Sequence, residues 1–202
     1  MRCWSMGTPV EISGSACILL ALLILVLPAD WLLAAFLAAA IHEMCHWLAV
    51  RTLGGEIYHF RMGSTGAVMQ SSPMEAWKQL LCILAGPMGS LSIVLFSEYL
   101  PKTALCGLVQ GLFNFLPVEP LDGGRAVSCI AGILFDAATA DNICRGITCM
   151  VLTVLLGFGL WGYFGLGLGY APVIIALLLI SAALREKFLA NRGDSEYNGR
   201  SK

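Results

Sequence analysis

Long apolar runs separated by short polar segments set the pattern of this chain. A helix needs about 20 apolar residues to cross the hydrocarbon core of a membrane. Runs near that length extend from Ile12 to Leu27, from Trp31 to Val50 and from Met74 to Tyr99. The apolar segment from Ile147 to Leu184 is long enough for two spans, divided near Gly162 to Pro172. The pattern therefore predicts a series of membrane-spanning helices.

The stretch from Thr103 to Phe135 is also apolar but is too long for one simple span. Pro117, Pro120 and the pair Gly123-Gly124 interrupt it. Because proline removes a backbone donor and glycine weakens a helix, we expect this fourth span to unwind. Unwound backbone within a membrane is tolerated only where it lines protein or a wet cavity. The interruption therefore predicts a site, with a simple loop as the alternative.

These runs predict an all-α polytopic membrane protein with about six transmembrane helices. Between the second and third runs, the strand-like pieces Ile57 to Met62 and Ala67 to Gln70 flank Gly63-Ser64-Thr65-Gly66. They predict a small β-hairpin on the cytoplasmic side, and an irregular loop is the alternative. We expect residues 1–190 to form the transmembrane domain and residues 191–202 to form a polar, disordered tail.

The composition agrees with a membrane protein, since 58% of the 202 residues are hydrophobic and 12% are charged. A net charge of −1 gives no indication of nucleic-acid binding. The eight cysteines are scattered and form no C-x-x-C pair, so we interpret them as small core residues rather than a disulfide framework.

The positive charges predict an orientation, because Lys and Arg near span ends stay preferentially cytoplasmic. With six spans and a cytoplasmic N-terminus, every Lys and Arg except Lys102 falls on the cytoplasmic side. Both termini are therefore predicted to be cytoplasmic. Arg2 is the only early positive charge and Pro28-Ala29-Asp30 leads straight into another apolar run, so we expect the first span to be retained rather than cleaved as a signal peptide.

Ionisable residues inside a span are costly and therefore indicate function. The second predicted span contains His42-Glu43-Met44-Cys45-His46, an H-E-x-x-H pattern. His42 and His46 share one helical face, so both imidazoles can bind one metal ion. Glu43 lies about 100° around the helix, where it can act as a general base on water at the metal. Zinc suits such a site, and other divalent metals stay open.

The alternative interpretation is that the histidines are ordinary core residues. It requires two of the chain's three histidines and a glutamate to lie by chance in one lipid-immersed helix. Each would cost about 3 kcal/mol or more if unpaired. We therefore favour the metal site. We interpret His59 as a surface residue and Cys45 as a packing residue.

A third protein ligand is needed, and two carboxylates fall at membrane depth. Glu119 and Asp122 both lie in the interrupted segment Asn114 to Arg125. The other acidic residues fall near span ends or outside the predicted spans. The residue pattern alone does not choose between the two carboxylates.

The H-E-x-x-H span followed by N-x-x-P-x-x-P-L-D-G-G resembles the site-2 protease family of intramembrane zinc metalloproteases. The resemblance implies that Asp122 is the third metal ligand and leaves Glu119 without a family role. It also implies that Asn114 helps to hold substrate backbone near the metal. Ala85-Gly86-Pro87 resembles the family's A-G-P-x-x-N segment, although Ser90 stands where Asn is usual. That departure puts one secondary polar contact in question and not the metal site.

The compact form, without an inserted PDZ domain, resembles the bacterial sporulation (SpoIVFB-like) group of this family. Members of that group often carry a C-terminal CBS domain, and we expect none here. The resemblance implies a zinc metalloendopeptidase that cleaves a membrane-associated protein, such as a pro-sigma or anti-sigma factor, under the control of other membrane proteins. It does not predict an oligomeric state.

Two functions of other classes are weighed against the protease. A membrane metal transporter could use the same histidines, but neither further intramembrane acids nor a His-rich loop is evident. A non-proteolytic membrane scaffold is the second alternative, and the intact Glu43 argues against it.

Overall fold

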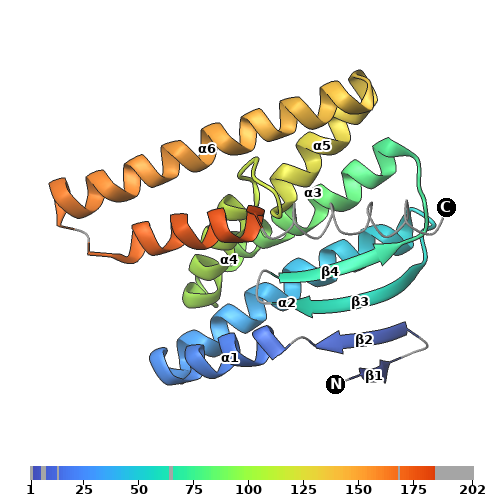
Figure 1. The fold of residues 1–202 in the computed structure, drawn as a ribbon. Helices are drawn as coiled ribbons and strands as arrows, with labels where there is room; N and C mark the ends of the chain where they lie inside the picture. The colour runs from blue at the N-terminus through green and yellow to red at the C-terminus, as the bar shows by residue number, and fades with distance from the viewer. Residues whose placement is uncertain (1, 6–7, 13, 64–65, 168, 185–202) are drawn as a thin grey trace. The chain divides into compact units, whose positions relative to one another are not determined.

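The computed structural model describes residues 2–5, 8–12, 14–63, 66–167 and 169–184. The chain divides into two compact units, Met1–Phe115 and Leu116–Lys202. Within the described residues, the first unit contains a four-stranded sheet, helices α1 to α4 and the 3-10 helix η1 (Figure 1). The second contains α5, α6 and the short apolar helix Ala171–Leu184.

The helices of the first unit follow the apolar runs of the sequence. They are α1 (Gly14–Val26), α2 (Ala29–Thr52), α3 (Ala76–Ser92), η1 (Ile93–Phe96) and α4 (Pro101–Asn114). Proline is well placed at the beginning of two of them, since Pro28 caps α2 and Pro101 opens α4. Its fixed φ suits a first helical turn, where its missing N–H has no partner to lose. The two prolines therefore favour the observed starts of α2 and α4.

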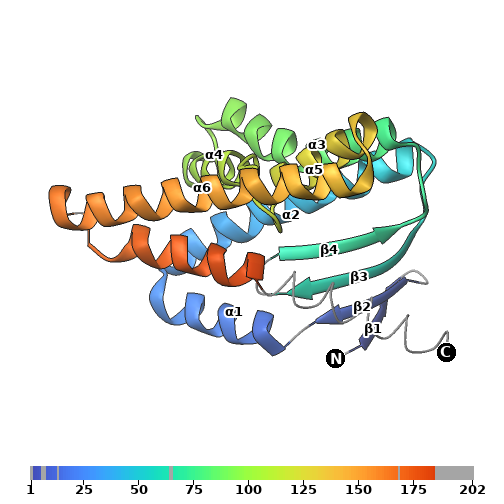
Figure 2. The same cartoon turned by 45° about the horizontal axis from the view of Figure 1, so that its top comes forward.

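The predicted hairpin is confirmed by β3 (Ile57–Gly63) and β4 (Gly66–Ser71), which pair antiparallel. The sheet is larger than the sequence indicated, because β1 (Arg2–Ser5) and β2 (Thr8–Ile12) extend it in the order β1-β2-β3-β4 (Figure 2). β2 runs parallel to β3. Such a pairing joins segments far apart in the chain and has no local turn signal, so the hairpin alone was predicted.

Helices α2, α3 and α4 pack together through small side chains. Gly107 and Gly111 of α4 face α3, where a Cβ on Gly107 would lie 2.8 Å from the backbone oxygen of Ser90. Glycine lets helix backbones approach closely at such a seam. The buried cluster Ala38, Ile93 and Ala104 lies in the same layer. These glycines therefore serve packing within the chain.

The second unit begins with an irregular segment and continues with α5 (Asp122–Leu134) and α6 (Ala137–Leu166). Helices α5 and α6 pack through the buried residues Ala131, Ala140 and Cys144. Asp136 caps α6, and hydrogen bonds from Thr139 hold the pKa of Asp136 below its usual value. α6 begins ten residues before the predicted Ile147, because its first turns carry the exposed ion pair Asp141–Arg145, which the apolar run could not include.

The predicted break in the fourth apolar stretch is confirmed, with one correction. Helix α4 ends at Asn114 and α5 begins at Asp122, so residues 115–121 are the unwound part. Gly123 and Gly124 do not unwind the chain as expected, because both lie in the first turn of α5. A Cβ on Gly124 would lie 2.4 Å from the carbonyl carbon of Val118. This glycine is needed so that the irregular segment can pack on the helix.

Three helices in the described part of the chain are long and apolar enough to cross a membrane, namely Ala29–Thr52, Ala76–Phe96 and Ala137–Leu166. In the most apolar 18-residue stretch of each helix, between 17% and 33% of the residues are buried. Large apolar side chains such as Phe36, Leu95 and Phe164 are correspondingly exposed. A soluble protein rarely leaves so much contiguous apolar surface in water, so these helices are those of a membrane protein. The remaining helices are shorter than a full span.

Candidate metal centre

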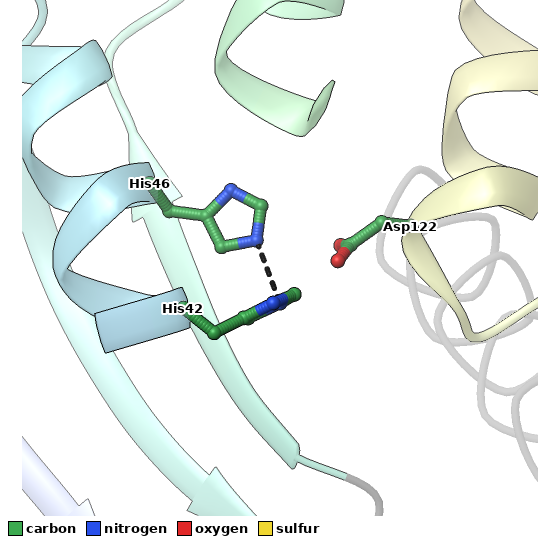
Figure 3. Close-up of side chains that lie close together, drawn as sticks. All are labelled: His42, His46 and Asp122. Carbon is green, nitrogen blue, oxygen red and sulfur yellow. Dashed lines mark hydrogen bonds between the residues drawn. The ribbon is translucent and has the colours of Figure 1, made fainter. Parts of the chain in front are cut away.

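The two histidines of the H-E-x-x-H segment lie together on α2, one helical turn apart (Figure 3). Their Nε2 atoms are 3.2 Å apart. The rings meet edge to face, with centroids 4.8 Å apart and planes at 83°. His42 is 3% exposed and His46 is half-buried. The predicted shared face is therefore realised with both Nε2 atoms converging.

The imidazole of His46 is oriented by the backbone of α3. Its Nδ1 lies 2.7 Å from the carbonyl oxygen of Cys82. A carbonyl can only accept, so Nδ1–H is the donor and Nε2 of a neutral ring carries the lone pair. That is the tautomer in which Nε2 can ligate a metal.

The imidazole of His42 is oriented by a side chain of α3. Its Nδ1 lies 2.8 Å from the hydroxyl oxygen of Ser90, and Ser90 is completely buried. Both rings are thus engaged through Nδ1, and both present Nε2 to the same point. Metal-binding histidines usually have their second nitrogen hydrogen-bonded in this way.

Glycines on α3 allow the helix to approach these rings. A Cβ on Gly86 would lie 2.1 Å from Nε2 of His46, and a Cβ on Gly89 would lie 2.2 Å from the sulfur of Cys45. Real Cβ atoms are essentially never closer than 3.0 Å to another heavy atom. Only glycine fits at both positions without movement of the facing residue. Sequence reasoning noted Gly86 within a motif but did not identify this role.

Glu43 lies beside the pair on α2 and is half-buried. One of its carboxylate oxygens is shielded from solvent. A shielded carboxylate on the residue that follows His42 is a candidate to accept and return a proton.

The carboxylate predicted as a ligand lies in the second unit. Asp122 is the first residue of α5 and is 6% exposed (Figure 3). The positive end of the helix dipole favours a negative side chain at this position. The preceding segment, residues 115–121, is irregular, and Leu121 is the N-cap, so Asp122 opens the helix.

The other predicted residues make contacts of their own. Asn114 is the last residue of α4, and its Nδ2 donates to the carbonyl oxygen of Gln110, 3.1 Å away. Glu119 accepts a hydrogen bond of 2.8 Å from Ser128 and lines a cavity of ≈ 290 Å³ in the second unit. His59 lies half-buried on β3.

The spacing of the two imidazoles in the first unit fits zinc. Two Zn–N bonds of about 2.0–2.1 Å at a tetrahedral angle would place the nitrogens about 3.3–3.4 Å apart. The observed Nε2 separation is 3.2 Å. Two imidazoles and one carboxylate, with a fourth position open, are also the usual composition of a catalytic zinc site.

Known proteins resemble this chain in sequence and in fold. No protein-family model matches the chain. The chain is 23% identical over 165 residues to a zinc metalloprotease of Methanocaldococcus jannaschii. That alignment covers 75% of this chain and 47% of the relative, so the chain spans about half the relative's length.

The chain also matches the solved structure of a site-2 protease from Methanocaldococcus jannaschii. The TM-score is 0.70 at 22% identity, and the match covers 92% of this chain and 94% of the other. The chain therefore has the fold of a site-2 protease, and the predicted resemblance is confirmed at the level of the fold.

Proposed function

We propose that the chain is an intramembrane zinc metalloprotease in which His42, His46 and Asp122 bind zinc and Glu43 is the general base. The observation that carries this proposal is the imidazole pair, with Nε2 atoms 3.2 Å apart, on an apolar helix long enough to cross a membrane. The names of the two relatives, a zinc metalloprotease and a site-2 protease, support the same activity.

The chain's own groups divide the chemistry between them. When bound, zinc polarises the scissile carbonyl and makes water acidic enough to be deprotonated near neutral pH. Glu43 accepts the proton of the attacking water and passes it to the leaving amine. The Nδ1 atoms of His42 and His46 are engaged by Ser90 and by the Cys82 carbonyl, which leaves Nε2 of each ring to bind the metal. Asp122 adds the negative charge that a neutral histidine pair lacks.

The position of the histidines along α2 supports cleavage at membrane depth. His42 lies twelve residues after Asp30 and nine before Arg51, or about 18 Å and about 13 Å along the helix at 1.5 Å per residue. At one end Lys102 pairs with Asp30 and lies over the ring of Trp31, and at the other Arg51 lies over the ring of Trp47. Such aromatic and cationic groups favour the two membrane interfaces. In the proposed orientation, Arg51 is cytoplasmic and the protein crosses the membrane about six times.

A substrate helix hides its peptide carbonyls in hydrogen bonds, so it must unwind before cleavage. β4 is an edge strand of the described sheet. An edge strand can pair with an extended peptide through main-chain hydrogen bonds. We propose that unwound substrate pairs with β4 and that Asn114 holds its backbone near the zinc. Helix-destabilising residues near the cleaved bond should then favour cleavage.

The test is cleavage of a co-expressed membrane protein by the wild type and by Glu43→Gln. Pro-sigma and anti-sigma factors are the first substrates to try, on the resemblance to the sporulation group. The variant keeps the size of the side chain and removes the base, so cleavage should fall about 10²–10⁴-fold. Zinc content, measured on the purified protein, should not change.

The same experiment separates the two alternatives. A metal transporter would carry metal equally well with Glu43→Gln and would cleave nothing. A scaffold would bind membrane proteins without wild-type cleavage. Wild-type protein that holds no stoichiometric zinc would contradict the proposed function directly.

A further inference from the structure

We propose that Ser90 is a positioning residue that sets the imidazole of His42 for zinc binding, with its hydroxyl able to serve Nδ1 as donor or as acceptor. The inference rests on the proposed function and assigns a role to a residue that the metal site does not itself contain. It concerns the first unit alone, since His42 lies on α2 and Ser90 on α3.

The hydroxyl of Ser90 is fixed on both sides by close helix packing. Its oxygen lies 2.8 Å from Nδ1 of His42, and the residue is 0% exposed. One turn earlier, Gly86 faces His46 so closely that no Cβ fits. On the other side of α3, a Cβ on Gly107 would lie 2.8 Å from the Ser90 carbonyl oxygen. α3 is therefore held between α2 and α4, and a side chain as short as serine reaches the ring.

The two rings have partners of different kinds at Nδ1. His46 faces the carbonyl oxygen of Cys82, which can only accept, whereas His42 faces the hydroxyl of Ser90, which can donate or accept. Serine therefore suits Nδ1 of His42 whichever ring nitrogen carries the proton.

If zinc is bound through Nε2 of His42, the ring proton would be on Nδ1 and the hydroxyl of Ser90 would accept it. A hydroxyl can change from donor to acceptor by rotating about one bond, without moving α3.

Ser90 stands at the position where the resembled A-G-P-x-x-N segment usually has Asn. The sequence left the secondary contact at this position in question. The contact is present, and it is made by the serine oxygen. An amide carries its donor and its acceptor on different atoms, whereas serine supplies both from one oxygen.

The test compares Ser90→Ala with Ser92→Ala in the purified full-length protein. Both changes remove one hydroxyl from α3, but the Ser92 hydroxyl donates 2.6 Å to the carbonyl oxygen of Gly89 in its own helix. The zinc dissociation constant is measured by chelator competition. Ser90→Ala should weaken zinc binding about 10–100-fold, whereas Ser92→Ala should leave it unchanged. The visible spectrum of the Co²⁺-loaded protein should change with Ser90→Ala alone.

Ser90→Thr retains the hydroxyl and should restore the wild-type zinc affinity. If Ser90→Ala does not fold, Ser90→Cys takes its place, because a thiol of similar size is a weak hydrogen-bonding group and should also lose affinity. Equal zinc affinity in wild type and Ser90→Ala would overturn the proposal and leave the proposed function standing. A Ser90→Ala protein that unfolds at a lower temperature in chelator but keeps the wild-type zinc affinity would likewise overturn the proposal. Failure of the wild type to bind zinc would instead contradict the proposed function.

Discussion

At the scale of single residues, the site depends on the hydrogen bonds that hold Nδ1 of His42 and Nδ1 of His46. His46 is fixed through a backbone carbonyl and His42 through a hydroxyl. The H-E-x-x-H pattern reveals the two rings because residues four apart share a helical face. The partners on α3 lie 36 and 48 positions away in the chain. One of them is a backbone oxygen, which every residue has, so the sequence could not indicate it.

The closest packing at the residue scale gives a sharp prediction for Gly86→Ala. The added Cβ would lie 2.1 Å from Nε2 of His46, so the ring must move away from its metal-binding position. We expect zinc affinity to fall at least about 10-fold, the lower end of the cost of disturbing a ligand's support. Chelator competition measures this. Gly132→Ala, where nothing lies within 4 Å of the added Cβ, is the matched control. Equal affinity in the two variants would show that His46 is not a ligand.

At the scale of elements, the sequence predicts which segments form helices better than it predicts where helices end and which strands pair. α2 begins and ends within two residues of the predicted run, because a membrane-spanning helix demands a long apolar segment. α3 begins two residues after Met74 but ends at Ser92, and η1 continues to Phe96, short of the predicted Tyr99. β2 was missed because it pairs with β3 across a long stretch of the chain. The short local pair of β1 with β2 was not recognised either. The beginning of α6 was missed because charged residues at an interface belong to the helix without being apolar.

The close contact between α3 and α4 predicts that two glycine-to-alanine changes, at Gly107 and at Gly146, have opposite effects on stability. Gly107→Ala places a Cβ 2.8 Å from the backbone oxygen of Ser90, which cannot move without shifting α3. Overpacking of this kind costs about 1–3 kcal/mol of the free energy of unfolding. Gly146→Ala lies in α6 with nothing within 4 Å of its Cβ, so it should gain about 0.4–1 kcal/mol. Unfolding in mixed micelles, followed by loss of helical signal, measures both. If Gly107→Ala proved as stable as Gly146→Ala, the tight seam would be refuted.

At the scale of the whole molecule, the number of spans shows where the sequence is insufficient. Five apolar stretches, the last long enough for two spans, predict about six spans at about 20 residues each. Three described helices meet that length, whereas α1 has 13 residues and the fourth run is divided into α4 and α5 with 14 and 13. Hydropathy counts residues and does not show where a run breaks. Six spans and cytoplasmic termini therefore stay predictions.

The proposed ligand set also makes a prediction for the whole molecule, because His42 and His46 belong to one compact unit and Asp122 to the other. Zinc held by all three should stabilise both units together, by about 2.7 kcal/mol at a free zinc concentration 100 times the dissociation constant. Hydrogen exchange should then slow in α2 and in α5 when zinc is added. Asp122→Ala should remove the zinc-dependent protection of α5. The control is Asp136→Ala, which removes another acidic residue at a helix N-terminus in the second unit and should preserve that protection. Zinc protection of α2 alone in the wild type would exclude Asp122 as a ligand and leave the histidine pair as the metal site.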